Sequence, residues 1–270
     1  QKTAYEIHER LVGSEMCIRD RDGTLIVDSQ FPQLKNNILD EIKKLGGGNI
    51  DYIINTHWHF DHAEGNRAFG PTGSTIIAHE NSREFMKNNN NINIVLVEYP
   101  QQAYENKSLP TITFKDEMKL NFNNNNISLH NFGPAHTTGD TIVFFKEENI
   151  IHFGDVLNID SMVFIDSGNG GSLSGMIKNL EQALKIMNKE TVVVPGHGQI
   201  TNYETVKRYL EGLIITKQKL IEMINNDMSL EEIIENNPIK NLEEILGDTT
   251  VLINRSYLSL TKDQTIEKEL

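Results

Sequence analysis

Most of the chain consists of short segments in which hydrophobic and polar residues follow a regular pattern, and each segment predicts one helix or strand. Apolar runs predict strands over Thr24–Asp28, Asp51–Asn55 and Thr75–Ala78. Between the first two runs, apolar residues of Leu34–Leu45 recur every three or four positions, which predicts a helix that the glycines at 46–48 end. A shorter helix is expected over Ser82–Lys87.

The middle of the chain favours strands, and the last third favours helices. Residues 112–132 alternate like strands joined at Asn123–Asn126, and a hairpin and a further strand are expected over Thr141–Phe145, Ile150–Phe153 and Thr191–Val194. Helical spacing covers Leu173–Met187 and, after Tyr203, the segments 203–225, 230–235 and 242–246. This order predicts two layers of sheet with helices outside them, and no linker divides residues 23–270. The Asn runs at 88–91 and 123–126 are of low complexity and are expected in surface loops.

Residues 1–22 lack this regularity, and we expect them to lie outside the fold. They do not show the basic and then apolar order of a signal peptide. The segment Leu11–Arg21, LVGSEMCIRDR, resembles the translated sequencing-adapter read-through that recurs at broken ends of assembled reads. The alternative is a genuine but irregular leader. On the first interpretation the native N-terminus is missing, and the sequence then gives no indication of the protein's compartment.

Composition and charge narrow the class of protein. The 270 residues are 38% hydrophobic and 23% charged, which is typical of a globular protein with a sizeable core. No window holds an uninterrupted apolar run long enough for a membrane-spanning helix. The net charge of −13 repels phosphate backbones and so argues against nucleic acid as a partner. Cys17 is the one cysteine, which excludes an internal disulfide and a Cys-rich zinc site.

The candidate chemistry lies in the histidines. The segment Thr56–His62, THWHFDH, places three imidazoles and one carboxylate directly after a predicted strand. Imidazole nitrogen and carboxylate oxygen are both zinc ligands, and residues two apart in an extended segment, such as His57 and His59, project to the same side. Asp61 and His62 follow a predicted turn and can face a neighbouring centre. Four donors here, with more downstream, indicate two metal ions.

Three further candidates stand where predicted strands end. His136 lies in Gly133–Asp140, Asp155 follows the strand that ends at Phe153, and His197 lies in Pro195–Gly198. Small residues beside each of them allow the loops to approach one another closely. Each segment alone is explained equally well by a surface turn, but together they form a consistent site.

This set of residues, His57-x-His59-x-Asp61-His62 followed by His136, Asp155 and His197, resembles the metallo-β-lactamase superfamily over about residues 23–209. The resemblance implies an α/β fold, a four-layer αββα sandwich with a dinuclear metal site at one edge. It also implies that His57, His59 and His136 bind the first metal, that Asp61, His62 and His197 bind the second, and that Asp155 bridges them. An Asp at 155, where β-lactamases of this pattern have Cys or Ser, is more similar to the glyoxalase II, lactonase and phosphodiesterase branches. Other local strings resemble an uncharacterised β-lactamase-like branch.

The function that the resemblance implies is a hydrolase of a small ester, thioester, lactone or lactam. Two Zn²⁺ ions, with Fe or Mn as the alternatives, would share a bridging water and activate it as hydroxide. Asp61 would hold the nucleophile or help to protonate the leaving group. Asp140 and Thr137 are candidate acceptors for the ligand histidines, and the alternative for Asp140 is a turn or cap residue. Trp58 is expected to pack against the pocket or to contact the substrate. The alternatives are a phosphodiesterase or nuclease and a non-catalytic metal-binding member of the family.

Overall fold

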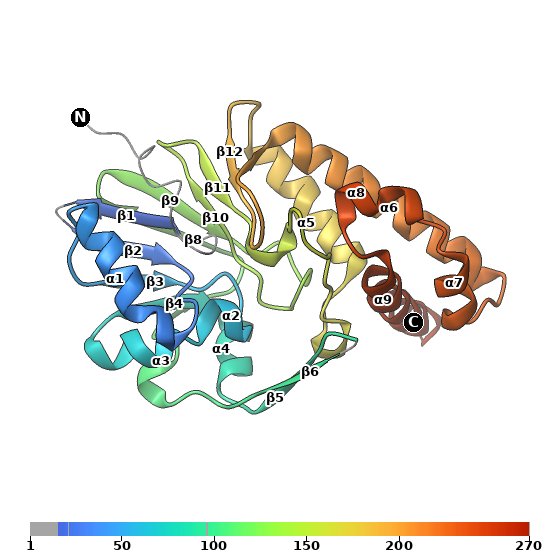
Figure 1. Ribbon diagram of the computed structural model, residues 1–270, viewed down its shortest axis with the longest axis horizontal. Helices are drawn as coiled ribbons and strands as arrows, with labels where there is room; N and C mark the ends of the chain where they lie inside the picture. Colours follow the sequence, from blue (N-terminus) through green and yellow to red (C-terminus); the bar gives the residue numbers. More distant parts are fainter. Residues whose placement is uncertain (1–15, 21, 96, 270) are drawn as a thin grey trace.

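Two β-sheets stacked face to face organise the computed structural model, which describes residues 16–20, 22–95 and 97–269 (Figure 1). The first sheet has the order β1 (Met16–Asp20), β2 (Gly23–Val27), β3 (Tyr52–Ile54), β4 (Thr75–His79) and β7 (Ile112–Phe114). The second has the order β13 (Thr201–Asn202), β12 (Val192–Val194), β11 (Ile150–His152), β10 (Ile142–Phe145), β9 (Asn125–His130) and β8 (Glu117–Phe122). Strands β2, β3, β4 and β7 are parallel, and β11 is parallel to β12.

Alternation along the strands divides the apolar residues between the inner and outer layers, because successive side chains of a strand point to opposite faces. In β2, Leu25 and Val27 face the second sheet and pack in one cluster with Val143 and Phe145. Ile26, between them, faces the other way and packs with residues of α1 (Lys35–Lys44). The inner cluster is therefore the core between the two sheets.

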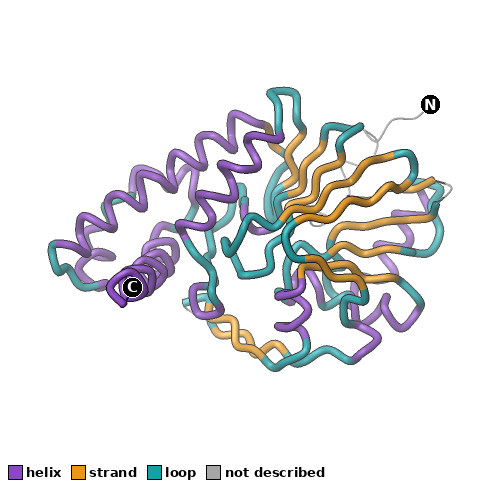
Figure 2. The backbone as a smooth tube through the Cα atoms, turned by 180° about the vertical axis from the view of Figure 1, so that it is seen from behind, coloured by secondary structure: helices purple, strands orange, loops and turns teal. Residues whose placement is uncertain are grey.

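Helices cover both outer faces (Figures 1 and 2). On the first sheet α1 is joined by the short helices α2 (Phe60–Ala63), α3 (Asn66–Phe69) and α4 (Glu80–Met86). On the second sheet lie α5 (Leu173–Ile186) and α6 (Tyr203–Asn225), and α7 (Leu230–Asn236), α8 (Glu243–Leu246) and α9 (Thr249–Glu269) extend this side. The predicted αββα sandwich with C-terminal helices is confirmed. None of the helices in the described part of the chain has the length and apolar character needed to cross a membrane.

Part of the segment that we expected outside the fold lies in the first sheet. Met16–Asp20 pairs antiparallel with β2 along its whole length. The edge of β2 presents unpaired backbone N–H and C=O groups, which any extended segment can pair with, so strand formation here depends little on side chains. The origin of residues 1–22 stays a prediction, and residues 1–15 and 21 lie outside the described residues.

Two Asn-rich segments also differ from their expected loops. Asn90–Asn93 forms β5 and pairs with β6 (Glu98–Gln101) in a separate hairpin. The turn expected over Asn123–Asn126 is confined to Asn123 and Asn124, whose φ angles are 51° and 63°. Asn tolerates the left-handed region, which a two-residue hairpin turn requires at both positions, so the other two asparagines remain in β9.

Candidate metal centre

All seven side chains that the sequence singled out as metal ligands lie together at one edge of the sandwich. They stand in the loops that follow β3, β9, β11 and β12, and in α2. Because β3 is parallel to β2 and β11 is parallel to β12, the carboxyl ends of these strands meet at the same edge. The ligand atoms fall into three overlapping groups, in each of which all atoms lie within 4.8 Å of one another: His57, His59 and His136; His57, His62 and Asp155; and Asp61, His62 and His197.

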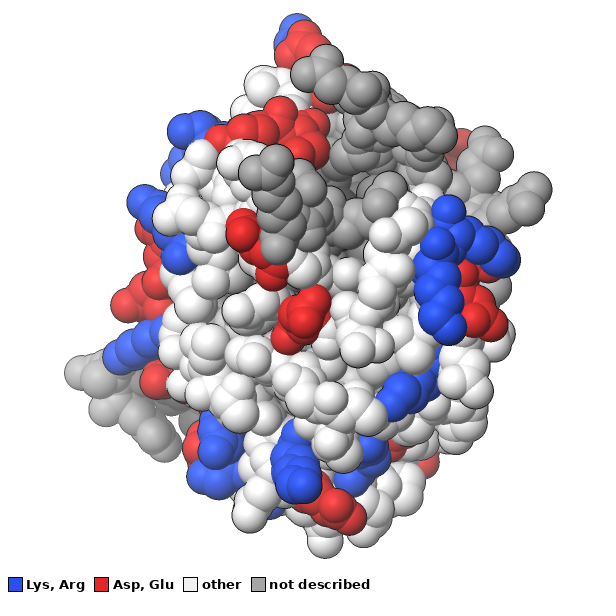
Figure 3. All heavy atoms as spheres, turned by 90° about the vertical axis from the view of Figure 1, so that its left-hand side faces the viewer, with Lys and Arg blue, Asp and Glu red and all other residues white. Residues whose placement is uncertain are grey.

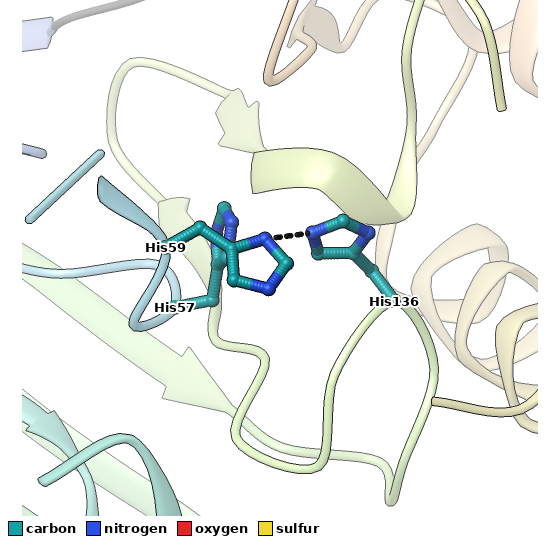
Figure 4. A group of neighbouring side chains, drawn as sticks. All are labelled: His57, His59 and His136. Atoms are coloured by element: carbon teal, nitrogen blue, oxygen red, sulfur yellow. Dashed lines mark hydrogen bonds between the residues drawn. The ribbon is translucent and has the colours of Figure 1, made fainter. Parts of the chain in front are cut away.

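Three buried histidines form the first group, and their rings point toward one another (Figure 4). The Nδ1 of His59 lies 2.9 Å from the Nε2 of His136. His136 donates its Nδ1–H to the carbonyl oxygen of Phe164 at 2.7 Å, and His59 donates its Nε2–H to Asp166 at 3.0 Å. Burial lowers the pKa of His136, which keeps its ring neutral. The two facing nitrogens therefore each present a lone pair.

His57 completes this group in the same way. Its Nδ1 lies 3.1 Å from the hydroxyl oxygen of Thr56, and that hydroxyl donates its own proton to Asp28 at 2.8 Å. The Nδ1 of His57 is therefore the donor, and its buried Nε2 has no hydrogen-bond partner. Burial and the neighbouring histidines hold the pKa of His57 well below its usual value. Three lone pairs without protons to share repel one another, so these residues fit a cation placed between them.

Asp61, His62 and His197 form what we call the second group, in which carboxylates surround two histidines. The Nε2 of His62 lies 3.0 Å from Asp155 Oδ1 and 3.6 Å from Asp61 Oδ2, and the Nε2 of His197 lies 3.2 Å from Asp61 and 3.4 Å from Asp155. Asp155 raises the pKa of His197 to about 10. Burial opposes the charged form of His62, but Asp155, Asp61 and Asp28 outweigh it and raise the pKa of His62 well above its usual value. This group also favours positive charge.

Asp155 stands between the two groups. Its Oδ2 lies 3.8 Å from the Nε2 of His136 in the first group and 3.4 Å from that of His197 in the second. Burial alone would raise the pKa of Asp155, but His197 and His62 hold it well below the usual value, so the group is a carboxylate. Gly196 allows this close approach, because a Cβ there would lie 2.0 Å from Asp155 Oδ1.

Two carboxylates that the sequence analysis did not single out orient the histidines. Asp28 accepts hydrogen bonds from Thr56 N at 2.7 Å, from the Thr56 hydroxyl at 2.8 Å and from His62 Nδ1 at 2.7 Å. Asp166 accepts from His59, as described above, and from Asn169 at 2.8 Å. The position of Asp28 at the end of the predicted strand Thr24–Asp28, beside the strand that precedes His57, was a signal that could have indicated its role.

Asp140 and Thr137, which the sequence analysis offered as acceptors for the histidines, bond to each other. Asp140 accepts from Thr137 N at 2.9 Å and from the Thr137 hydroxyl at 2.6 Å. Burial raises the pKa of Asp140 to about 6. This pair stabilises the turn after His136, and the acceptors for the histidine rings are Asp28, Asp166, Thr56 and the Phe164 carbonyl.

Comparison with known proteins agrees with this fold. The sequence profile described as the metallo-beta-lactamase superfamily matches residues 13–197, which is more than half of the chain. The chain belongs to this superfamily. A curated relative, metallo-beta-lactamase IND-1 of Chryseobacterium indologenes, is 19% identical over 199 residues, which are 73% of this chain and 77% of the relative.

Solved structures of metallo-beta-lactamases share the fold. The metallo-beta-lactamase from Pontibacter korlensis matches with a TM-score of 0.60 and 18% identity, over 74% of this chain and 86% of that one. The DIM-1 metallo-beta-lactamase matches with a TM-score of 0.59 and 21% identity, over 75% and 86% of the two chains. The superfamily profile ends at His197, so α6 to α9 of this superfamily member lie beyond the matched residues.

Trp58 of this metallo-beta-lactamase superfamily member packs beside the centre rather than facing the open space. It is fully buried, stacks on Phe85 with ring centroids 4.7 Å apart, and meets the ring of His59 edge-on at 4.6 Å. A cavity of about 170 Å³ opens over the centre, and Trp58 is not in its lining. The packing role that the sequence offered for Trp58 therefore accounts for its position, and the structure provides no support for substrate contact.

Proposed function

We propose that this protein is a metal-dependent hydrolase that holds two zinc ions and cleaves a small ester, thioester, lactone or lactam. The observation that carries the proposal is the convergence of unprotonated nitrogens of His57, His59 and His136 beside a second donor group. A cavity opens directly onto both groups, so a small molecule can reach them. The superfamily relationship agrees with a hydrolase.

In this proposal His57, His59 and His136 would hold the first metal, and Asp61, His62 and His197 would hold the second. Asp155 would serve both metals, which its distances to histidines of both groups support. Donor sets of imidazole and carboxylate suit Zn²⁺, and iron or manganese also accept them. Bound divalent cations would lower the pKa of a coordinated water toward about 7 and polarise the scissile carbonyl.

The residues of the chain supply orientation and a proton site. Asp28 and Asp166 fix the tautomers and ring directions of His62 and His59, so that each presents a lone pair to its metal. Asp61 lines the cavity, and its side chain is the more exposed of the two carboxylates in the centre, at 24% against 8% for Asp155. This exposure supports the proposed role of Asp61, which would orient the attacking water and transfer a proton to the leaving group.

A small molecule, rather than a nucleic acid, is the proposed substrate. The net charge is −13, and on the face that Figure 3 shows, Lys and Arg side chains lie in separate clusters among Asp and Glu instead of forming one basic surface. The net charge supports hydrolysis of an acyl compound over cleavage of a phosphodiester backbone.

The test is hydrolysis by the zinc-loaded full chain of a chromogenic cephalosporin, a lactone, a thioester and p-nitrophenyl esters, with and without a chelator. We expect chelator-sensitive turnover of at least one class. His57→Ala and Asp155→Ala should abolish it while circular dichroism shows that the protein stays folded. His130→Ala is the matched control, because His130 is half-buried on β9 and stacks on Phe132, outside the centre. Equal turnover in His57→Ala and the control would refute the site.

A further inference from the structure

The wall of the cavity beyond the metal-binding groups is apolar. It is formed by Phe60, Ile92, Ile94, Met162 and Phe164. The polar side chains of the lining are Asn158, Ser161 and four proposed metal ligands, namely His59, Asp61, Asp155 and His197. Among the described residues that line the cavity there is no lysine and no arginine. Away from the metal-binding groups, a negatively charged group on a bound molecule would therefore meet no lysine or arginine side chain.

This wall is held in place by the body of the protein. Ile92 lies in β5, and Ile94 is the residue that follows β5 in the β5–β6 hairpin. Figure 1 shows this hairpin reaching toward the C-terminal helices. Ile92 is fully buried and packs in one cluster with Trp58, Phe164 and Val251 of α9. Asn91 accepts a hydrogen bond through its carbonyl from Asn169 at 3.0 Å. The hairpin is thus held by contacts with α9 and with Asn169.

Arg255 forms a hydrogen bond with the hairpin that carries part of this wall. Arg255 of α9 is 5% exposed and donates from Nη2 to the side-chain oxygen of Asn93. It is not part of the cavity lining. The hydrogen bond to Asn93 therefore engages Arg255 outside the cavity lining.

We propose that the cavity selects a neutral acyl substrate with an apolar side group and rejects a substrate that carries a further carboxylate away from the scissile bond. This inference rests on the hydrolase function proposed above. An alkyl or aryl group placed against Ile92, Ile94, Met162 and Phe164 leaves water and gains apolar contact. A carboxylate at the same place loses its hydration without gaining a cation. Ile94 and Met162 are the proposed specificity-determining residues.

Binding is tested with three hydroxamic acids that share one metal-binding head. Acetohydroxamic acid has no tail, hexanohydroxamic acid has an apolar tail, and adipic monohydroxamic acid has a tail of the same length that ends in a carboxylate. Isothermal titration calorimetry on the zinc-loaded full chain gives each Kd. The hexano compound should bind about fourfold more tightly than the aceto compound for each buried methylene, which is about 0.8 kcal/mol. The adipic compound should bind about tenfold more weakly than the hexano compound, or weaker still.

Lysine substitutions test the wall directly. Ile94→Lys or Met162→Lys supplies the missing cation and should cancel or reverse the preference for the hexano compound. Val97→Lys is the matched control, because Val97 is on the same hairpin, is 63% exposed and does not line the cavity. It should keep the wild-type preference. Using two separate wall positions protects the test against one variant that fails to fold, which circular dichroism would reveal.

The outcomes separate this inference from the function on which it rests. Wild-type protein that binds the adipic compound as tightly as the hexano compound overturns the selectivity, whatever its activity. Clear selectivity together with no chelator-sensitive turnover of the cephalosporin, the lactone, the thioester or any p-nitrophenyl ester supports the apolar wall and overturns the hydrolase. Loss of selectivity in Val97→Lys as well as in Ile94→Lys assigns the effect to net charge and overturns the role of the wall.

Discussion

Asp28 is the residue whose replacement best tests how the centre is held. It is 2% exposed, has a φ of 62°, and accepts three hydrogen bonds, two from Thr56 and one from His62, all between 2.7 and 2.8 Å. Asp28→Asn keeps the size of the side chain but replaces one acceptor oxygen with an NH₂ group. The Nδ1–H of His62 and the hydroxyl of Thr56 both donate to Oδ2 of Asp28. An NH₂ group at that position would face these two donors and could accept from neither.

The expected cost follows from the bonds lost. A hydrogen bond to a charged group contributes about 1.5–3 kcal/mol, and every 1.4 kcal/mol corresponds to about tenfold in an equilibrium constant. Loss of the bond to His62 should therefore weaken the metal held by Asp61, His62 and His197 by about 10- to 100-fold, the usual range for residues that orient metal ligands. The metal held by His57, His59 and His136 should be affected less, since Thr56 still lies beside His57.

The assay is competition for zinc with a chromophoric chelator, which resolves two affinities. Asp51→Asn is the matched control, because Asp51 accepts from Thr24 N at 2.8 Å at the opposite end of β2. We expect the control to bind both metals like wild type. Two unchanged zinc affinities in Asp28→Asn would refute the reasoning, as would an equal loss in Asp51→Asn.

Three shorter predictions concern metal binding and the hairpin turn. Removing zinc from a sample that holds each proposed site at 100 times its Kd should lower stability by about 2.7 kcal/mol and Tm by roughly 5–10 °C for each site, measured by calorimetry with and without chelator. Gly196→Ala should weaken zinc binding about tenfold or more in the same competition assay, because its Cβ would lie 2.0 Å from Asp155 Oδ1 and 2.6 Å from the Gly154 carbonyl carbon. Asn124→Ala should cost about 1 kcal/mol in urea unfolding because φ is 63°, whereas Asn124→Gly should be neutral.

The sequence alone predicted most of the architecture where local pattern and burial agree. The strand over Thr24–Asp28 and the helix over Leu34–Leu45 were found because apolar spacing at 2 or 3.6 residues directly reflects which face packs on the core. The β5–β6 hairpin was missed, because an Asn run has low strand propensity and Ile92 and Ile94 show their purpose only against Trp58 and Phe164. The alternating pattern of residues 112–132 also gave no sign that its first two strands separate: Ile112–Phe114 and Glu117–Phe122 lie in different sheets.

The sequence by itself determined the candidate ligands, because His57-x-His59-x-Asp61-His62 with His136, Asp155 and His197 has few explanations other than a metal centre. Only the tertiary structure decided which atoms face the centre. The tautomers of His59, His62 and His136 depend on Asp166, Asp28 and the Phe164 carbonyl, which are 107, 34 and 28 residues away from them along the chain. The charge of the cavity wall is likewise a tertiary property. Ile94 lines the cavity whereas Arg255, which bonds to the same hairpin through Asn93, does not, and no local pattern encodes the direction in which two packed segments face.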